Sequence, residues 1–203
     1  MDQKIEKIRQ FFDDLEANKN GYYDYQACKR CKGKGCCQHF PCFYAPWDFI
    51  VLSHDKYTHE ERLIILTELL KQGKISIDMI WLADQEFGPL NPESKEPDLE
   101  KISNEDGCLF LRARAKDHPI IDFQYFLEEG HNFPCINWDP DKGCQYSEEE
   151  RPYGGCMLKP FLAVVNGENR IYCHDMVDYE KFVEAWGKHQ RLLYDLYLVF
   201  KEM

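Results

Sequence analysis

Four cysteines lie within ten residues near the start of the chain, in the stretch CKRCKGKGCC from Cys28 to Cys37. Lysine and arginine side chains fill the gaps between them, although the chain as a whole has a formal net charge of -11. Thiolates that lie close together repel one another unless a metal ion or nearby cations compensate their charge, and such cations also lower the pKa of a thiol. The stretch is therefore typical of a site where cysteines bind a metal ion.

A second group of cysteines lies in PCINWDPDKGCQYSEEERPYGGC, much later in the chain. Its glycine and proline residues predict tight turns, which bring sulfur atoms together and expose backbone N–H groups to them. A lone C-x-x-C pair is enough for a redox dithiol, but two groups of cysteines exceed what that chemistry needs. We therefore predict metal ligation by every cysteine except Cys108, namely Cys28, Cys31, Cys36, Cys37, Cys42, Cys135, Cys144, Cys156 and Cys173.

The type of ligand leaves the metal open, because thiolates hold both zinc in a closed tetrahedral site and a [4Fe–4S] cluster. The softness of the ligands favours an iron–sulfur cluster, with zinc as the alternative. Neighbouring cysteines have diverging side chains, so Cys36 and Cys37 are compatible with one centre or two. His39 and His174 are spare candidates, although a lone histidine is more often structural or solvated. Cys108 lies in an apolar stretch and reads as a small buried residue.

The composition of the chain disfavours a membrane-spanning protein, a secreted protein and a nucleic-acid-binding protein. No apolar run approaches the length of a membrane-spanning helix, and the N-terminal stretch lacks the features of a signal peptide. We predict a cytoplasmic protein, where thiols stay reduced and disulfides are the weaker interpretation. The acidic net charge disfavours nucleic acid, so the expected partner is an unidentified protein or electron donor. Phosphate-binding glycine loops and the common hydrolase motifs are missing from the sequence, which leaves enzymatic activity undecided.

The elements that must position these cysteines predict one α+β domain over residues 1–203, with cysteine-rich metal-binding loops. Apolar residues at helical spacing predict an amphipathic N-terminal helix. Thr58 and Glu61 form a capping box that begins a helix over 59–72, with Gly73 as its stop. KISIDMIW is compatible with a strand or a helix, and the first cysteine stretch reads as a loop.

The remaining segments predict short strands and a final helix. Residues 84–107 contain prolines and many acidic side chains, which predicts a long loop or flexible insertion. CLFLRAR and PIIDF are typical of strands, and Asn166–Gly167 predicts the turn of a hairpin. Residues 174–203 predict a C-terminal helix that is interrupted at Gly187 and packs over the core. Arg112 and Arg114 share one strand face, where surface arginines facing acidic residues are the expected arrangement.

These motifs resemble the YkgJ-type cysteine-cluster family, whose CxxCxxCC domain is described as zinc- or iron-chelating. The first half of the resemblance lies in Cys28-x2-Cys31, in the adjacent cysteine pair, and in Cys42 ahead of Asp48. KGCQYSEEERPYGGCMLKP is similar to the second half, with matching residues Gly143, Cys144, Glu149, Arg151, Pro152, Cys156 and Pro160, while Cys135 and Cys173 match the cysteines before and after that block. The chain departs from the family pattern by four residues between the second and third cysteines and by Met157 in place of arginine.

The resemblance covers about residues 28–173 and implies an iron–sulfur or zinc centre. A related branch, the flagellin lysine methylases, couples such a centre to transfer of a methyl group from S-adenosylmethionine. A cluster-dependent enzyme with an activity like that of a protein-lysine methyltransferase is therefore one alternative. A sensor whose dithiols close reversibly is the other.

Overall fold

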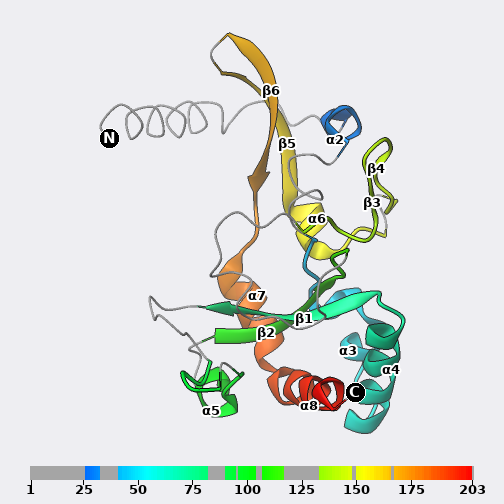
Figure 1. Cartoon of the computed structure of the whole chain (residues 1–203), viewed down its shortest axis with the longest axis vertical. Coiled ribbons are helices and arrows are strands. Elements are labelled where there is room, and N and C mark those ends of the chain that lie inside the picture. The colour runs from blue at the N-terminus through cyan, green and yellow to red at the C-terminus, as the bar shows by residue number, and fades with distance from the viewer. Residues whose placement is uncertain are drawn as a thin grey trace.

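The computed structural model describes residues 26–32, 41–81, 90–94, 96–103, 107–116, 133–147, 150–165 and 167–202. Helices and short antiparallel strands alternate through these residues, which confirms a mixed α+β fold (Figure 1). The expected N-terminal helix and the strand expected at PIIDF lie outside the described residues. No helix in the described part of the chain is both long and apolar enough to span a membrane.

A two-stranded antiparallel ribbon forms the centre of the core. β1 (Ile75–Trp81) pairs with β2 (Gly107–Ala113), with Ile75 opposite Ala113 and Met79 opposite Leu109. KISIDMIW is therefore a strand, and the strand predicted at CLFLRAR is confirmed. Alternate residues of a strand point to opposite faces, so Ile75, Met79 and Leu109 share one buried face of the ribbon.

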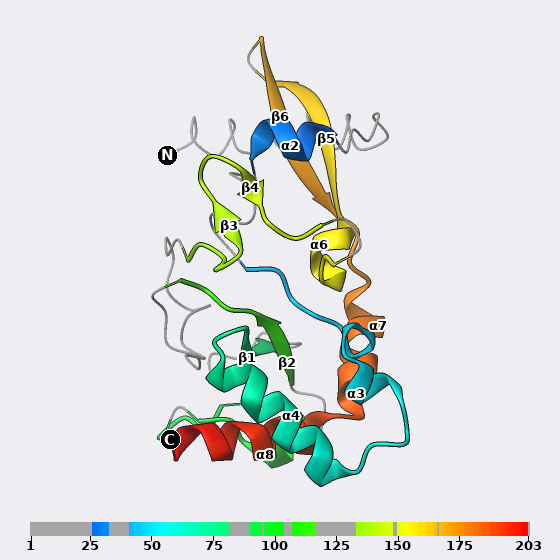
Figure 2. The same ribbon diagram turned by 90° about the vertical axis from the view of Figure 1, so that its right-hand side faces the viewer.

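Two helices pack together beside this ribbon, as Figure 2 shows. α4 (His59–Lys71) begins at the predicted capping box, in which Thr58 Oγ1 accepts from the Glu61 N–H and the Glu61 carboxylate accepts from the Thr58 N–H. Gly73 has a φ of 65°, the left-handed conformation that ends a helix without steric cost to glycine. α8 (Gln190–Lys201) packs against α4. The two helices contribute the fully buried Leu66, Leu70, Leu193 and Leu196 to the core.

The C-terminal part is a pair of helices preceded by a strand. β6 (Glu168–Asp175) contains the first residues of the predicted helix, and α7 (Tyr179–Gly187) begins only where the Asp178 side chain accepts from the Lys181 N–H. α7 ends at Gly187, which confirms the predicted interruption. The prediction of helix from residue 174 was wrong because pairing with β5 (Leu158–Val165) extends β6 through Asp175.

Gln190, at the start of α8, pairs with the edge of β2 through its side chain. Its Oε1 accepts from the Leu109 N–H at 2.7 Å, and its Nε2 donates to the Leu109 carbonyl and to the Trp186 carbonyl, both at 2.9 Å. A primary amide carries both a donor and an acceptor. Gln190 thus takes the place of a further strand at this position of β2.

Part of the predicted loop 84–107 is helical. α5 (Leu99–Ser103) lies in this segment, and Leu90 bridges to Pro97. Leu90 and Ile102 are 0% and 2% exposed, so apolar side chains anchor this segment to the core. The prolines and acidic residues that suggested a loop lie around these anchors.

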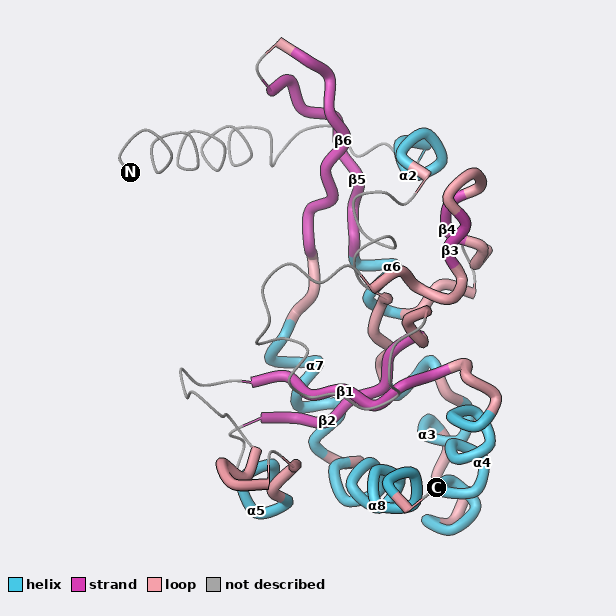
Figure 3. The backbone as a smooth tube through the Cα atoms, viewed as in Figure 1, coloured by secondary structure: helices cyan, strands magenta, loops and turns pink. Residues whose placement is uncertain are grey.

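Three short elements that carry predicted cysteine ligands lie toward the β5–β6 hairpin in Figure 3: α2 (Gln26–Cys31), β4 (Gly143–Cys144), which pairs with β3 (Trp138–Asp139), and α6 (Tyr153–Met157). η1 (Pro46–Asp48) and α3 (Ile50–Ser53) instead lead from the Cys42 segment to α4, with which α3 is in contact. The predicted turn is confirmed, with Gly167 at a φ of 79°. The prediction that CKRC is a loop was wrong: it is helical, and Ala, Lys and Arg are good helix formers.

Candidate metal centre

Residues 42–44 pair with the same edge of β2 to which the Gln190 side chain binds at Leu109. The Ala113 N–H donates to the Cys42 carbonyl at 2.9 Å, and the Tyr44 N–H donates to the Leu111 carbonyl at 2.8 Å. Phe43 lies opposite Arg112 in this pairing. Because side chains alternate between faces, Cys42 and Tyr44 project from the sheet face that carries Ala113.

Cys135 reaches the same face from another segment. The chain beyond β2 pairs with residues 134–136 through the hydrogen bonds Ile136 N–H to Arg114 carbonyl and Lys116 N–H to Pro134 carbonyl, each 2.8 Å long. Cys135 stands opposite Ala115, and directly opposed residues of antiparallel strands share a face. Ala113 and Ala115 are 0% and 6% exposed. Two buried alanines, the smallest side chains available, therefore belong to the face from which Cys42 and Cys135 project.

A pair of tyrosine hydroxyls lies beside these two cysteines. Tyr44 Oη and Tyr146 Oη are 2.9 Å apart, and Asn137 Nδ2 donates to Tyr146 Oη at 2.6 Å. Burial is the main cause that raises the pKa of Tyr44 to about 12; the hydrogen bond with Tyr146 opposes the shift, and negative charge on Cys42 and Cys135 contributes to it. Burial also raises the pKa of Tyr146, with the same two cysteines contributing. Both phenols are thus close enough to both cysteines to interact with their charges.

Cys144 lies close enough to Cys135 to affect the pKa of its thiol. Burial raises the pKa of the Cys135 thiol to about 11; a hydrogen bond from the Asn137 backbone opposes this shift, and a charge on Cys144 adds to it. Lys116 and Arg112 lower the pKa of the same thiol. Cations thus accompany the second cysteine group, as the sequence had suggested only for the first.

The helix α2 is fixed against the hairpin that carries Cys144. Trp138 Nε1 donates to the Lys32 carbonyl at 2.8 Å. Gly143 has a φ of 84°, and a Cβ placed there would come within 2.9 Å of Lys32 Cα. Only glycine permits this approach. Cys31, directly before Lys32 in the chain, is thereby held near the hairpin of Cys144, and Figure 2 shows α2 beside β4.

Asp48 connects the Cys42 segment to α6. Its Oδ2 accepts from the Ala45 N–H at 2.8 Å and from the Tyr153 N–H at 2.9 Å. Burial raises the pKa of Asp48, and these backbone hydrogen bonds oppose the shift. A Cβ built on Gly155 would lie 3.7 Å from Cys42 Sγ. The segment before Cys156 therefore packs directly against the Cys42 sulfur.

The structure brings some of the predicted ligands into one region. Cys42 and Cys135 share a sheet face, and the charge of Cys144 acts on Cys135. Cys31 and Cys156 lie on adjoining segments, and Cys173 lies on β6 opposite Pro160. Cys36, Cys37 and His39 lie outside the described residues, as does the side chain of Cys28. Within the described ranges, no three His, Cys, Asp or Glu side chains form a group that could hold a metal ion. The type of side chain nevertheless suits a thiolate-bound metal, because soft sulfur donors lie beside cationic side chains.

Sequence reasoning missed the hydroxyl network and placed one residue, Arg112, differently. Tyr44, two residues after Cys42, has as its partner Tyr146, two residues after Cys144. That shared spacing, a tyrosine two positions after a cysteine, is the available signal. Arg112 was expected on the surface; it is 7% exposed, and its Nη1 lies 2.5 Å from Asp78 Oδ2. Cys108 is 1% exposed, which confirms its predicted burial.

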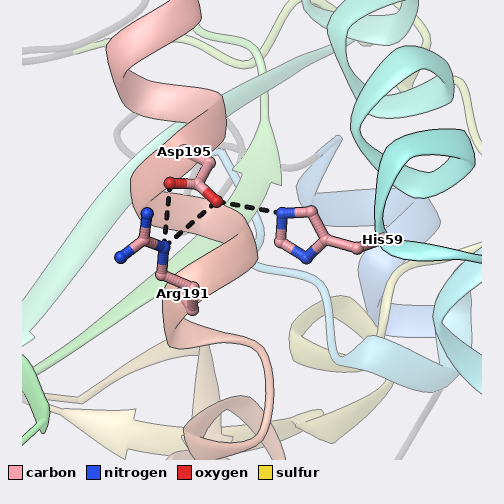
Figure 4. Close-up of polar contacts among 3 residues, drawn as sticks. All are labelled: His59, Arg191 and Asp195. Atoms are coloured by element: carbon pink, nitrogen blue, oxygen red, sulfur yellow. Dashed lines mark hydrogen bonds and ion pairs between the residues drawn. The ribbon is translucent and has the colours of Figure 1, made fainter.

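A separate polar group joins α4 to α8 (Figure 4). His59 Nε2 lies 2.9 Å from Asp195 Oδ2, and Arg191 Nε lies 3.0 Å from Asp195 Oδ1. The His59 side chain is 52% exposed, so this ion pair contributes little to stability. The positive charge of Arg191 beside the carboxylate also disfavours a metal cation at this position.

In the comparisons with known proteins, no family model, no curated protein and no solved structure matches the chain.

Proposed function

We propose that this protein binds metal through cysteine thiolates in one or two centres, with an iron–sulfur cluster as the leading assignment and zinc as the alternative. The observation that supports this most is that Cys42 and Cys135 project from one sheet face beside the Tyr44–Tyr146 pair, with Cys144 close enough to Cys135 to raise its pKa. Cys42 and Cys135 are distant in sequence, and pairing with the chain through Ala113 and Ala115 brings them to the same face.

The electrostatics of Cys135 favour metal binding over reversible thiol oxidation. A reactive sensor cysteine needs a low pKa and access to solvent. Cys135 is 2% exposed and has a raised pKa. A bound metal cation would lower the pKa of Cys135, because it compensates the negative charges of the Cys135 and Cys144 thiolates.

Ligands for the proposed centre come from two sources. The described residues supply Cys42 and Cys135 on one sheet face and Cys144, whose charge acts on Cys135, with Cys31 and Cys156 on adjoining segments. The sequence adds Cys28, Cys36, Cys37 and Cys173. When bound, an iron–sulfur cluster would supply electron transfer, whereas zinc would supply folding free energy.

Analysis of protein purified without oxygen or chelator tests the proposal. Iron, zinc and acid-labile sulfide are measured per chain, together with an absorption spectrum. Iron with matching sulfide supports a cluster, and stoichiometric zinc without sulfide supports the alternative. Protein that is free of metal, and that binds neither iron with sulfide nor zinc on reconstitution, would refute the proposal.

Matched cysteine variants then test the ligand set. Cys144→Ser and Cys31→Ser are expected to lower the metal content, whereas Cys108→Ser keeps it unchanged because Cys108 is buried beside Gln190, within the core. Equal loss in all three variants would contradict the assignment. Unchanged metal content in Cys144→Ser would remove that residue from the centre.

A further inference from the structure

The guanidinium of Arg114, the residue that follows β2, has no acceptor within the chain as described. Its Nη1 is buried and has no hydrogen-bond partner, and the rest of its side chain forms no hydrogen bond or ion pair with the described residues. The expected pairing of arginine with an acidic residue thus holds for Arg112, which binds Asp78, but not for Arg114. A buried polar group without a partner is rare in folded proteins and indicates an acceptor that comes from outside the chain.

A second cation lies directly across the ribbon from Arg114. The Arg114 N–H donates to the Lys74 carbonyl at 3.3 Å, which continues the pairing of Ile75 with Ala113 by one residue. Residues opposed in this way have Cβ atoms about 4.5–5.5 Å apart, and like charges in such a pair destabilise the sheet. Within the described ranges neither Lys74 nor Arg114 has a carboxylate partner, although the chain has 36 acidic and 25 basic residues. This pair of cations therefore lacks the compensating charge that the composition could easily supply.

An apolar side chain lies on the other side of Arg114. The Ile136 N–H donates to the Arg114 carbonyl at 2.8 Å, so Arg114 stands between Lys74 on one neighbouring segment and Ile136 on the other. Ile136 is 44% exposed, and Lys74 is exposed as well. The end of the ribbon thus presents two cations and an apolar side chain at the surface.

We propose that Arg114 and Lys74 bind a phosphate group, carried by a small organic molecule. The planar guanidinium donates two parallel hydrogen bonds to an oxyanion, and the lysine ammonium adds a point charge. Two neighbouring cations match the charge of a phosphate monoester, about -1.5 to -2 at neutral pH, better than that of a single carboxylate. The exposed Ile136 favours an organic phosphate over the free ion, because it offers apolar contact to the rest of the ligand. This inference does not depend on the proposed metal centre.

Isothermal titration calorimetry of the full-length protein with three probes tests the proposal. The probes are phenyl phosphate, inorganic phosphate and benzoate, and chloride keeps the ionic strength constant because salt screens exposed charges. We expect saturable binding of phenyl phosphate, weaker binding of inorganic phosphate and the weakest binding of benzoate. Benzoate carries the same ring as phenyl phosphate but only one negative charge.

Two variants remove the proposed ligands, and two matched controls remove the same charges elsewhere. Arg114→Gln is expected to raise the Kd of phenyl phosphate about tenfold or more, which is the usual effect of losing a hydrogen bond to a charged group. Lys74→Met is expected to raise it by a smaller factor, because the ammonium acts mainly through its charge. The control variants Arg191→Gln and Lys181→Met should leave the Kd unchanged, because a carboxylate already pairs with each of these cations.

Several results would overturn the proposal. They are the lack of saturable binding of either phosphate probe, binding of benzoate as tight as that of phenyl phosphate, and equal weakening by Arg191→Gln and Arg114→Gln. Inorganic phosphate that binds as tightly as phenyl phosphate, and that loses affinity in Arg114→Gln, would support the same site with free phosphate as its ligand. If Arg114→Gln does not fold, the exposed Lys74 decides: the same Kd in Lys74→Met and Lys181→Met contradicts the proposal.

Discussion

Replacing Gln190 by methionine tests whether the hydrogen bonds of its side chain to the edge of β2 stabilise the fold. Gln190 is 6% exposed, and its side chain makes four hydrogen bonds: two to the N–H and C=O of Leu109, one to the Trp186 carbonyl and one to Cys108 Sγ. Methionine has a similar length and keeps most of the apolar packing. Gln190→Met leaves the Leu109 N–H without its partner, in a position that is 0% exposed, and leaves the Leu109 carbonyl with only the weak donor Cys108 Sγ at 3.3 Å.

The expected loss is large for a single substitution. A buried polar group without a partner costs about 1–3 kcal/mol, so the unpaired Leu109 N–H costs about this much, and the weakened hydrogen bonding of the Leu109 carbonyl adds to it. Domains of this size are stable by about 5–15 kcal/mol. Gln190→Met is therefore expected to remove a substantial part of the free energy of unfolding, while the protein remains folded at low temperature.

Urea unfolding followed by circular dichroism measures this loss against a control. Gln72→Met makes the same substitution at an exposed position after α4, where a change within about 0.5 kcal/mol is expected. Gln190→Glu gives a second test, because only its protonated form keeps both a donor and an acceptor; its stability relative to the wild type should improve as the pH falls. A Gln190→Met protein within about 1 kcal/mol of the wild type would refute the reasoning.

Three further predictions follow from the core and the cysteine region. Removing either partner of the buried Asp78–Arg112 ion pair is expected to cost about 3–5 kcal/mol, whereas replacing both by apolar residues costs less than the sum of the single changes, as a double-mutant cycle will measure. Gly143→Ala is expected to destabilise more than Gly167→Ala: both glycines have positive φ, but only the first would also collide with backbone; equal losses in thermal unfolding would contradict this. Burial lowers the pKa of His189, so its contribution to stability is present above the unfolded pKa near 6.5 and is lost as the pH falls through the folded pKa. His189→Gln should flatten the pH dependence of unfolding in this range, and an unchanged slope would contradict the assignment.

Local signals were sufficient for the elements that depend on neighbouring residues. The capping box at Thr58 and Glu61 predicted the start of α4, and Asn166–Gly167 predicted the β5–β6 turn. Apolar character predicted β2, although not its partner. In each case the deciding interaction joins residues that are close in sequence.

Contacts between distant segments could not be predicted in this way. CKRC became a helix although its cysteine and glycine surroundings indicated a loop, and its docking depends on the close approach of Gly143 to Lys32. The pairing of residues 42–44 with β2 has no signature in either segment. The gathering of Cys42 and Cys135 follows from that pairing, so the sequence indicated which residues are candidate ligands but not which of them meet.

The attachment of the Cys42 segment also sets an order of events during synthesis. Trp186 Nε1 donates to the Tyr44 carbonyl at 3.1 Å, and the edge of β2 beside this segment is completed by the Gln190 side chain. Both residues are translated after Cys173, the last predicted cysteine ligand. Domains generally fold as units during synthesis, so the Cys42 segment reaches its final position only once the α7–α8 corner has left the ribosome. Assembly of the proposed metal centre would then be completed only after these helices have been translated.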